Sequence, residues 1–146
     1  MDILEFKGEY RWLSNFWPSK VTFDGVCYPS VENAYQAAKT IYIPQREQFK
    51  NCTAGQARRL GRSNVKVRDD WHDVKVDIMR SLIEQKFAPG TELAEKLKST
   101  GDGQLVEGNT WGDIFWGACH GHGHNVLGKL LMQQRSLLQK DSFPIN

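Results

Sequence analysis

Apolar residues near the start of this chain recur with the period of an α-helix. After Ser30, four apolar positions are spaced i, i+3, i+4 and i+7, so they share one face of a helix that begins at residue 31. These positions are Val31, Ala34, Tyr35 and Ala38. The Ser30 hydroxyl is suited to cap the first turn by accepting a backbone N–H. The pattern predicts a helix that is buried along this face.

The same period, with the usual start and stop residues, predicts further helices. The longest begins at Asp69 or Asp70, where acids suit the helix dipole, and ends near Phe87. Its apolar stripe is expected to consist of Trp71, Val74, Ile78 and Leu82. The other expected helices cover 45–50 after Pro44, the segment from a Thr53 cap to Arg62, 91–99, and a last helix capped by Asn125 with Leu127, Leu130, Leu131, Leu137 and Leu138 as its apolar residues.

Strand signals are short and few. Val21–Tyr28 is typical of a β-hairpin, because Asp24-Gly25 suits the positive dihedral angles of a two-residue turn. The other expected strands are a first one at Leu4, Phe6 and Tyr10 and a last one over 104–107. We therefore predict an α+β fold, with a single domain over 1–146 that is mostly helical and has a small antiparallel sheet near the N-terminus.

Composition limits the classes of protein. Of 146 residues, 40% are hydrophobic and 25% charged, which is ordinary for a globular domain, and a net charge of +2 does not indicate a protein that coats nucleic acid. Three cysteines without CxxC spacing argue against a disulfide framework or a four-cysteine zinc site. There is no membrane-length apolar run and no signal peptide, so we expect a cytoplasmic protein with no membrane partner.

The polar side of the helix that begins at residue 31 carries candidate chemistry. Glu32, Gln36 and Lys39 are spaced i, i+4 and i+7, so an acid, an amide and an amine project from one face. The alternative is a solvated face with a modest ion pair, which is the commoner fate of such a stripe. The apolar opposite face already supplies burial, and this favours a functional role.

A second candidate is the glycine-rich segment 110–125, which has no helical or strand period. Asp113 and Trp116 lie between Gly112 and Gly117. Glycine lets the main chain approach a ligand closely, and an indole ring offers a stacking surface, so we predict a loop that lines a cavity. The alternative is a turn aspartate beside core tryptophans.

Two further clusters are less specific. In an extended chain, His120, His122 and His124 would point the same way and suggest a metal site, but the ligand set is incomplete. The alternative is a flexible loop whose amides wrap a phosphate, and we expect no metal and no cofactor. Five positive charges within residues 58–68 either face solvent or contact phosphates. They are Arg58, Arg59, Arg62, Lys66 and Arg68.

Short motifs run in one order along nearly the whole chain. They are Leu13-Ser14-Asn15-Phe16, the segment 32–39, Ala57 to Arg62, Trp71 followed by Lys75, Lys86-Phe87, Leu105-Val106-Glu107, Asp113 to Gly117, and 123–132. Jointly they resemble the YbiA/NADAR family. The resemblance implies a YbiA-like fold and an N-glycosidase. Members are associated with cleaving phosphoribosylated riboflavin-pathway intermediates or with removing ADP-ribose from guanine bases.

The resemblance also implies site residues and partners. The implied catalytic residues are Glu32, Lys39 and Asp113. The substrate-binding candidates come from the resemblance together with the helix face, the glycine-rich loop and the cation cluster. They are Asn15, Phe16, Gln36, Arg62, Trp71, Trp116, Gly117 and Asn125. The implied partner is a small molecule or nucleotide that carries ribose phosphate, and ADP-ribosylated DNA is a further one. Asn33, where many members have histidine, and the histidine-rich loop bear on substrate choice.

Cleavage of a ribose C1–N bond passes through an oxocarbenium-like transition state, which calls for a fixed carboxylate, a proton for the base and a nucleophile. Glu32 or Asp113 could hold the ribose or activate water. Lys39 could act as a cation, or as a neutral amine that attacks C1 and forms a Schiff base. The competing classes are a non-catalytic ADP-ribose or nucleotide-binding module and a histidine-based metal hydrolase.

Overall fold

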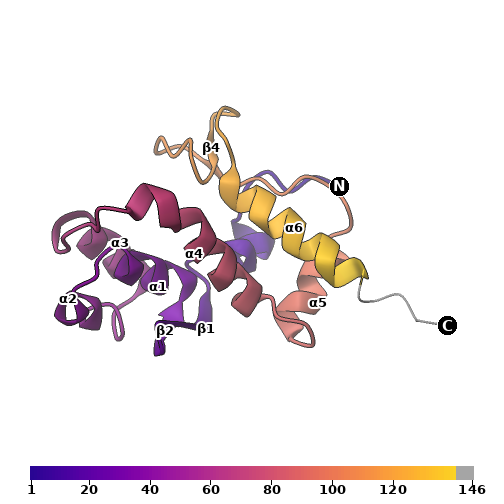
Figure 1. The fold of residues 1–146 in the computed structure, drawn as a ribbon. Helices are drawn as coiled ribbons and strands as arrows, with labels where there is room; N and C mark the ends of the chain where they lie inside the picture. Colours follow the sequence, from indigo (N-terminus) through magenta and orange to yellow (C-terminus); the bar gives the residue numbers. More distant parts are fainter. Residues whose placement is uncertain (141–146) are drawn as a thin grey trace. The chain divides into compact units, whose positions relative to one another are not determined.

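The computed structural model describes residues 1–140, and chain contacts divide it into two compact units. The central unit comprises 15–86, and the terminal unit comprises 1–14 together with the chain from 87 onward. Figure 1 shows the elements of both units. The predicted α+β class, rich in helix with a small antiparallel sheet, is confirmed. The domain predicted over 1–146 includes six final positions that lie outside the described residues.

The central unit begins with the predicted hairpin. Strands β1 (Pro18–Phe23) and β2 (Val26–Ser30) pair antiparallel, with Phe23 opposite Val26. Asp24 and Gly25 have φ of 49° and 78°, as a two-residue hairpin turn requires. The helices that follow are α1 (Val31–Ala38), α2 (Ile43–Glu47), α3 (Ala54–Ser63) and α4 (Trp71–Lys86).

Helix α1 is the centre of the central unit. It packs against both strands of the hairpin and against α3 and α4. All eight of its residues are buried, although the pattern predicted only one buried face. The buried apolar residues of the central unit outside α1 include Val21, Tyr28, Phe49, Ala57, Met79, Leu82 and Ile83. A polar side chain on α1 therefore lies inside the unit, whichever way it points.

The terminal unit has a different build. It contains the 3-10 helix η1 (Gly8–Leu13), α5 (Glu92–Ser99), the strands β3 (Gly108–Asn109) and β4 (Ala118–Cys119), and α6 (Val126–Lys140). The two short strands pair in parallel, and α5 packs against α6. Its buried side chains include Ile3, Leu13, Phe87, Leu97, Leu105, Leu127 and Leu131. Within residues 1–140, no helix is both long and apolar enough to cross a bilayer.

Two expected strands are wrong. Where Leu4, Phe6 and Tyr10 suggested a first strand, residues 8–13 wind into η1, and Ile3 alone forms a bridge to Leu105. The segment 104–107 contributes only this bridge. The Asn125 side chain explains why, since it donates to the carbonyl of residue 105 and accepts from the N–H of residue 107, where a strand partner would bind.

Helix starts and caps follow the sequence closely, with two corrections. Ser30, Thr53 and Thr91 cap α1, α3 and α5 with their hydroxyls, as predicted for the first two. Helix α2 begins at Ile43 rather than 45, because the first turn needs no N–H from Pro44. The predicted cap at Asn125 is wrong. Its φ is +50°, and its side chain binds the backbone of residues 105 and 107 instead of the first turn of α6.

The buried stripes of the two long helices also differ from the prediction. In α4, Val74 and Ile78 are only half-buried, and the buried residues are Trp71, Met79, Leu82, Ile83 and Lys86. In α6, Leu137 is 53% exposed while the other predicted leucines are buried. In both helices the spacing of apolar residues correctly predicted a helix. Which residues are buried depended on the elements that pack against it.

Candidate active site

Helix α1 holds Glu32 and Gln36 in buried positions. Glu32 is 8% exposed and Gln36 5%, and Gln36 Nε2 donates to Glu32 Oε1 at 2.8 Å. The Glu32 N–H donates to the Asn15 carbonyl at 3.1 Å, which ties the start of the helix to the early loop. The solvated-face alternative for this stripe is therefore wrong. A buried carboxylate held by an amide donor has a defined direction.

The Gln36 amide is only half satisfied. Its Oε1 is buried and has no hydrogen-bond partner within residues 1–140. The atom faces Gly61 of α3, where a Cβ would overlap it. An unsatisfied buried acceptor costs about 1–3 kcal/mol, so this orientation of the amide is maintained against a real penalty.

Lys39 lies at the C-terminal end of α1 and is half-buried. Burial lowers the pKa of its amine from the ordinary value, and the nearby Arg62, Arg58 and Lys75 lower it further. Glu32 opposes these effects by favouring the charged amine. The result is an ammonium group that releases its proton more readily than a surface lysine does.

Two aromatic rings lie beside this amine in the central unit. Lys39 Nζ is 5.7 Å from the centre of the Tyr35 ring. Tyr35 in turn packs against Trp71, with ring centroids 5.1 Å apart and planes inclined by 55°. Trp71 is 7% exposed, so its predicted place in the apolar stripe of α4 is confirmed. Its role in substrate binding stays a prediction.

The early loop contributes the predicted residues Asn15 and Phe16. Asn15 is buried, and its Nδ2 donates to Met79 Sδ at 3.6 Å. Its Oδ1 is a second buried acceptor without a partner among the described residues. Phe16 is 41% exposed, which leaves a ring surface open for contact. Both residues remain substrate-binding predictions.

Asn33, the departure from the family pattern, has a structural role here. It is fully buried, and its Nδ2 donates to the carbonyls of Phe49 and Cys52, both at 2.9 Å. Its N–H donates to the Ser30 hydroxyl that caps the helix. Asn33 thus joins α1 to the loop before α3.

The five-cation cluster divides once the chain is folded. Arg58 and Arg62 act on the Lys39 amine, as noted above. Arg68 instead forms a two-point ion pair with Asp70, at 2.6 and 3.0 Å. Lys66 Nζ lies 5.8 Å from the Tyr42 ring. Two arginines of the cluster therefore lie near enough to Lys39 to affect its pKa, whereas Arg68 and Lys66 contact other residues.

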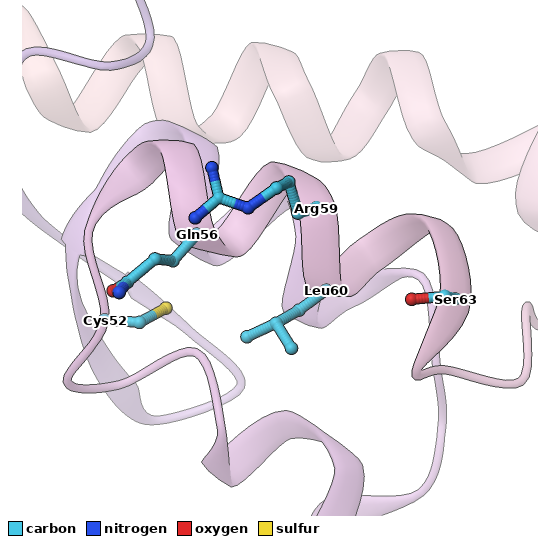
Figure 2. A pocket seen from close by; sticks show the side chains of 5 residues that line it. All are labelled: Cys52, Gln56, Arg59, Leu60 and Ser63. Carbon is cyan, nitrogen blue, oxygen red and sulfur yellow. The ribbon is translucent and has the colours of Figure 1, made fainter.

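Arg59 belongs to a separate hollow on α3, shown in Figure 2. The hollow has a volume of about 380 Å³ and is lined by Cys52, Gln56, Arg59, Leu60 and Ser63. Gln56 completes the capping box of α3 with Thr53. Burial raises the pKa of the Cys52 thiol, which makes it a poor nucleophile at neutral pH.

In the terminal unit, Asp113 organises a tight turn. Its Oδ1 accepts the N–H groups of Phe115 at 3.1 Å and Trp116 at 3.0 Å. Asn109 binds the Asp113 backbone from both sides, donating to its carbonyl at 2.9 Å and accepting from its N–H at 3.1 Å. Trp116 is half-buried and meets Phe115 edge-on, with ring centroids 4.9 Å apart. The turn reading of Asp113 thus has direct support, and its catalytic role stays a prediction.

Gly117 and Asn125 hold the same loop together. A Cβ at Gly117 would overlap the carbonyl and carboxylate of Glu107, so only glycine fits this approach. The Asn125 N–H donates to the Gly117 carbonyl at 3.1 Å, and the Asn125 side chain reaches the 105–107 segment. These contacts give both residues a structural function, while their predicted contact with substrate remains open to test.

The histidine segment is a turn rather than an extended strand, which corrects the geometry behind the metal hypothesis. Cys119 and His122 exchange backbone hydrogen bonds at 2.8 and 3.0 Å, and His120 and Gly121 have φ of 51° and 82°. Successive histidines therefore do not alternate as in a strand. No group of three His, Cys, Asp or Glu side chains suited to a metal occurs in residues 1–140.

Sequence reasoning gave no individual role to three residues that the structure singles out. Gly61 was visible as a glycine inside a helix, which signals close packing. Asn109 gave no signal by itself, because its importance comes from its contacts with Asp113. Lys86 is 2% exposed and follows the spacing of Met79 and Ile83 on α4, and burial lowers its pKa to about 7.

Comparison with known proteins assigns the family. The NADAR domain model matches residues 5–139. The chain is 38% identical to the N-glycosidase YbiA of Escherichia coli over 135 residues, covering 89% of this chain and 82% of YbiA. It is 41% identical to a riboflavin biosynthesis protein of Vibrio vulnificus over 134 residues, covering 90% of this chain but only 36% of that longer protein.

A solved structure agrees with this assignment. The NMR structure of Escherichia coli YbiA matches with a TM-score of 0.83 at 31% identity, covering all of this chain and 89% of YbiA. An N-glycosidase of Nostoc punctiforme is 37% identical over 134 residues, covering 86% of this chain and 84% of that protein. The expected reaction type, that of an N-glycosyl hydrolase, is confirmed by these names, and the chain belongs to the NADAR family.

Proposed function

We propose that this chain hydrolyses the ribose C1–N bond of a phosphoribosylated base, and that α1 supplies central catalytic groups. The observation that carries the proposal is the combination of a buried, hydrogen-bonded Glu32 with a half-buried Lys39 of lowered pKa on one helix. Perturbed ionisable groups held in fixed directions are typical of catalytic sites. The names of the relatives support the reaction type.

Glu32 is proposed as the carboxylate that faces the developing positive charge at C1 or activates water. A carboxylate fixed before reaction stabilises that charge without reorganising during the reaction. Asp113 is the second proposed carboxylate. Its Oδ1 already binds two N–H groups, so any catalytic contribution would come from its charge and its fixed direction.

Lys39 is proposed as the nucleophile. Its neutral amine attacks C1, the C1–N bond to the base breaks, and the base leaves with that electron pair and takes up a proton. The sugar ring then opens to a Schiff base, and water releases the sugar and restores the amine. The lowered pKa supports this role because it increases the fraction of neutral amine at neutral pH. The alternative is a permanently charged Lys39 that binds phosphate.

The cations around Lys39 suit a substrate that carries phosphate. Arg58, Arg62 and Lys75 all lie near enough to lower the pKa of the Lys39 amine. A phosphate bound between them would offset their mutual repulsion. They are therefore proposed as the phosphate-binding group of the site.

The preferred substrate class is a phosphoribosylaminopyrimidine. Relatives from Vibrio vulnificus and Zea mays are named riboflavin biosynthesis proteins, at 41% and 37% identity. The second candidate is an ADP-ribosylated guanine, as a nucleotide or in DNA. Several cations lie near Lys39, so the site could bind the pyrophosphate of ADP-ribose as well as a single phosphate, and this supports the second candidate.

Mass spectrometry of products tests the proposal. The protein is incubated separately with a phosphoribosylaminopyrimidine and with ADP-ribosylated guanosine nucleotide, and the released base and sugar are measured. Borohydride is then added during turnover. A sugar adduct on Lys39 supports the nucleophile, whereas turnover without an adduct supports the charged role. Binding of either compound without release of base would favour the binding-module alternative.

A further inference from the structure

A glycine inside α3 requires an explanation. Gly61 lies in the last turn of α3 (Ala54–Ser63), still inside the helix, where glycine is less favourable than alanine. Its surroundings differ from those of Gly55, which lies in the first turn of the same helix. A Cβ at Gly55 would meet open space, whereas a Cβ at Gly61 would overlap Gln36 Oε1 and lie 2.7 Å from Gln36 Cδ. Gly61 therefore leaves room for one particular amide.

The direction of that amide follows from its other contact. Gln36 Nε2 donates to Glu32 Oε1 at 2.8 Å. Reversing the amide would place its oxygen against a carboxylate oxygen, so the nitrogen must face Glu32 and the oxygen must face α3. The oxygen stays unpartnered within the described chain. The fold thus accepts an unsatisfied acceptor while keeping a donor on Glu32.

We propose that Gly61 and Gln36 act as a positioning pair for the Glu32 carboxylate. Gly61 provides the space in which the Gln36 amide lies, and the amide fixes the direction of the carboxylate. This inference rests on the catalytic role proposed for Glu32. It changes the role of Gln36 from a substrate-binding residue to one that acts through Glu32, and it gives Gly61 a role in the reaction.

The pair has a distinctive kinetic consequence. If Gln36 bound the substrate directly, its loss would raise KM. If it aims Glu32 at charge that develops only in the transition state, its loss lowers kcat and leaves KM nearly unchanged. The two readings are thus separated by steady-state kinetics.

Gly61→Ala is the first test, with Gly55→Ala as the matched control on the same helix. The added methyl should turn the Gln36 amide away, because the atoms in its path are the far end of a flexible side chain. We expect kcat to fall about 10- to 100-fold, the scale of one charge-assisted hydrogen bond, with KM within about twofold. Gly55→Ala should keep wild-type kcat. Wild-type kcat in a folded Gly61→Ala protein would overturn the proposal.

A double-mutant cycle tests whether the two residues act together. Gln36→Ala should reproduce the loss of kcat, and adding Gly61→Ala to it should lower kcat by less than about twofold, because the displaced group is already gone. Losses that multiply would mean that Gly61 acts independently of Gln36, against the proposal. If Gly61→Ala fails to fold, Gln36→Ala and Gln36→Asn decide, since wild-type kcat in both would overturn the pair.

Glu32→Gln separates failure of the pair from failure of the proposed function. The assay uses whichever of the two substrates above is turned over. An inactive Glu32→Gln protein with unimpaired Gln36 and Gly61 variants would refute only the positioning pair. Wild-type kcat in Glu32→Gln would refute the catalytic role of Glu32, and the positioning pair with it.

Discussion

Helix α1 and the 107–125 loop both carry polar residues that the sequence marks as functional, but their polar groups are used differently. In the loop, the side chains of Asp113, Asn109 and Asn125 bind backbone N–H and carbonyl groups. On α1, Gln36 binds the side chain of Glu32 and leaves its own oxygen unpartnered among the described residues. The loop uses polar groups to set the path of the chain.

Folding alone accounts for the polar residues of the loop but not for those of α1. A side chain that binds backbone in a turn has a sufficient structural reason to be there. A buried carboxylate with a half-satisfied amide, next to a lysine of lowered pKa, costs stability. Such costs are typical of functional sites. Helix α1 is therefore a stronger candidate for the catalytic groups than the loop, and variants of both regions test this ranking.

The largest expected effect is on α1. Glu32→Gln and Lys39→Ala should each lower kcat by about 10²- to 10⁴-fold, as for loss of an acid–base or nucleophilic group. The double variant should be little worse than either single one if the residues share one step. Lys50→Ala is the control, since Lys50 pairs with Glu47 on the surface three residues away. Near-normal turnover in both single variants would contradict the assignment of α1.

Asp113→Asn tests the loop with a smaller expected effect. An asparagine Oδ1 can still accept from Phe115 and Trp116, so the turn is kept while the charge is removed. We expect kcat to fall about 10²-fold with little change in substrate binding, as when one preorganised electrostatic group is removed. Asp113→Ala, which also loses the turn, should lower the melting temperature. An unchanged rate in Asp113→Asn would leave the loop with a structural role only.

Lys86 provides a test of electrostatic cost in the central unit. Burial lowers its pKa to about 7 from 10.5. Between those pH values the unfolded chain holds a proton that the folded chain has released, so the free energy of unfolding rises with pH. The rise is at most about 1.4 kcal/mol per pH unit. Lys86→Met should remove this rise, and Lys50→Met should not.

Urea unfolding at several pH values from 6.5 to 9.5 measures the Lys86 contribution. At the low end the lysine is mostly charged in both states, so the folded protein bears most of the cost of burying that charge. Lys86→Met should therefore be most stabilising relative to wild type near pH 6.5. The same pH dependence in wild type and Lys86→Met would contradict the assigned cause.

The smallest expected effect is that of metal removal. Treatment with EDTA, and the variants His120→Ala and His122→Ala, should change kcat by less than about twofold. A zinc hydrolase needs three protein ligands in rigid positions, and residues 1–140 hold no group of three suitable side chains. Turnover before and after chelation is the measurement. If chelation abolished activity and added zinc restored it, the histidine turn would become part of the candidate site, and the loop rather than α1 would be the stronger candidate for catalysis.

Much of the fold was predictable because local chemistry decides it. Asp24-Gly25 favours one kind of turn whatever surrounds it, and Ser30 and Thr53 satisfy N–H groups a few positions away. The strands expected near Leu4 and over 104–107 failed for the opposite reason. A strand needs a partner, and here the Asn125 side chain binds the backbone that a partner strand would have bound.

The candidate site divides in the same way. The spacing of Glu32, Gln36 and Lys39 showed that they share a helix face, because that relation depends only on helical geometry. The spacing could not show that the face is buried, since burial depends on what packs against it. Gly61 and Lys86 were missed for this reason, and their meaning appears only when α3 packs on α1 and when α4 is buried along one side.

The hairpin, most helix starts and the grouping of polar residues on α1 could be predicted from the sequence, because they follow from interactions within a few positions along the chain. Through motifs in a shared order, the sequence also indicated the family. Which of those polar groups are removed from water depends on how the helices pack, and the sequence pattern did not show it. That loss of water lowers the pKa of Lys39, leaves the Gln36 oxygen without a partner in the described chain, and makes Gly61 necessary. Desolvation depends on the atoms that surround a group, and distant parts of the chain supply most of them.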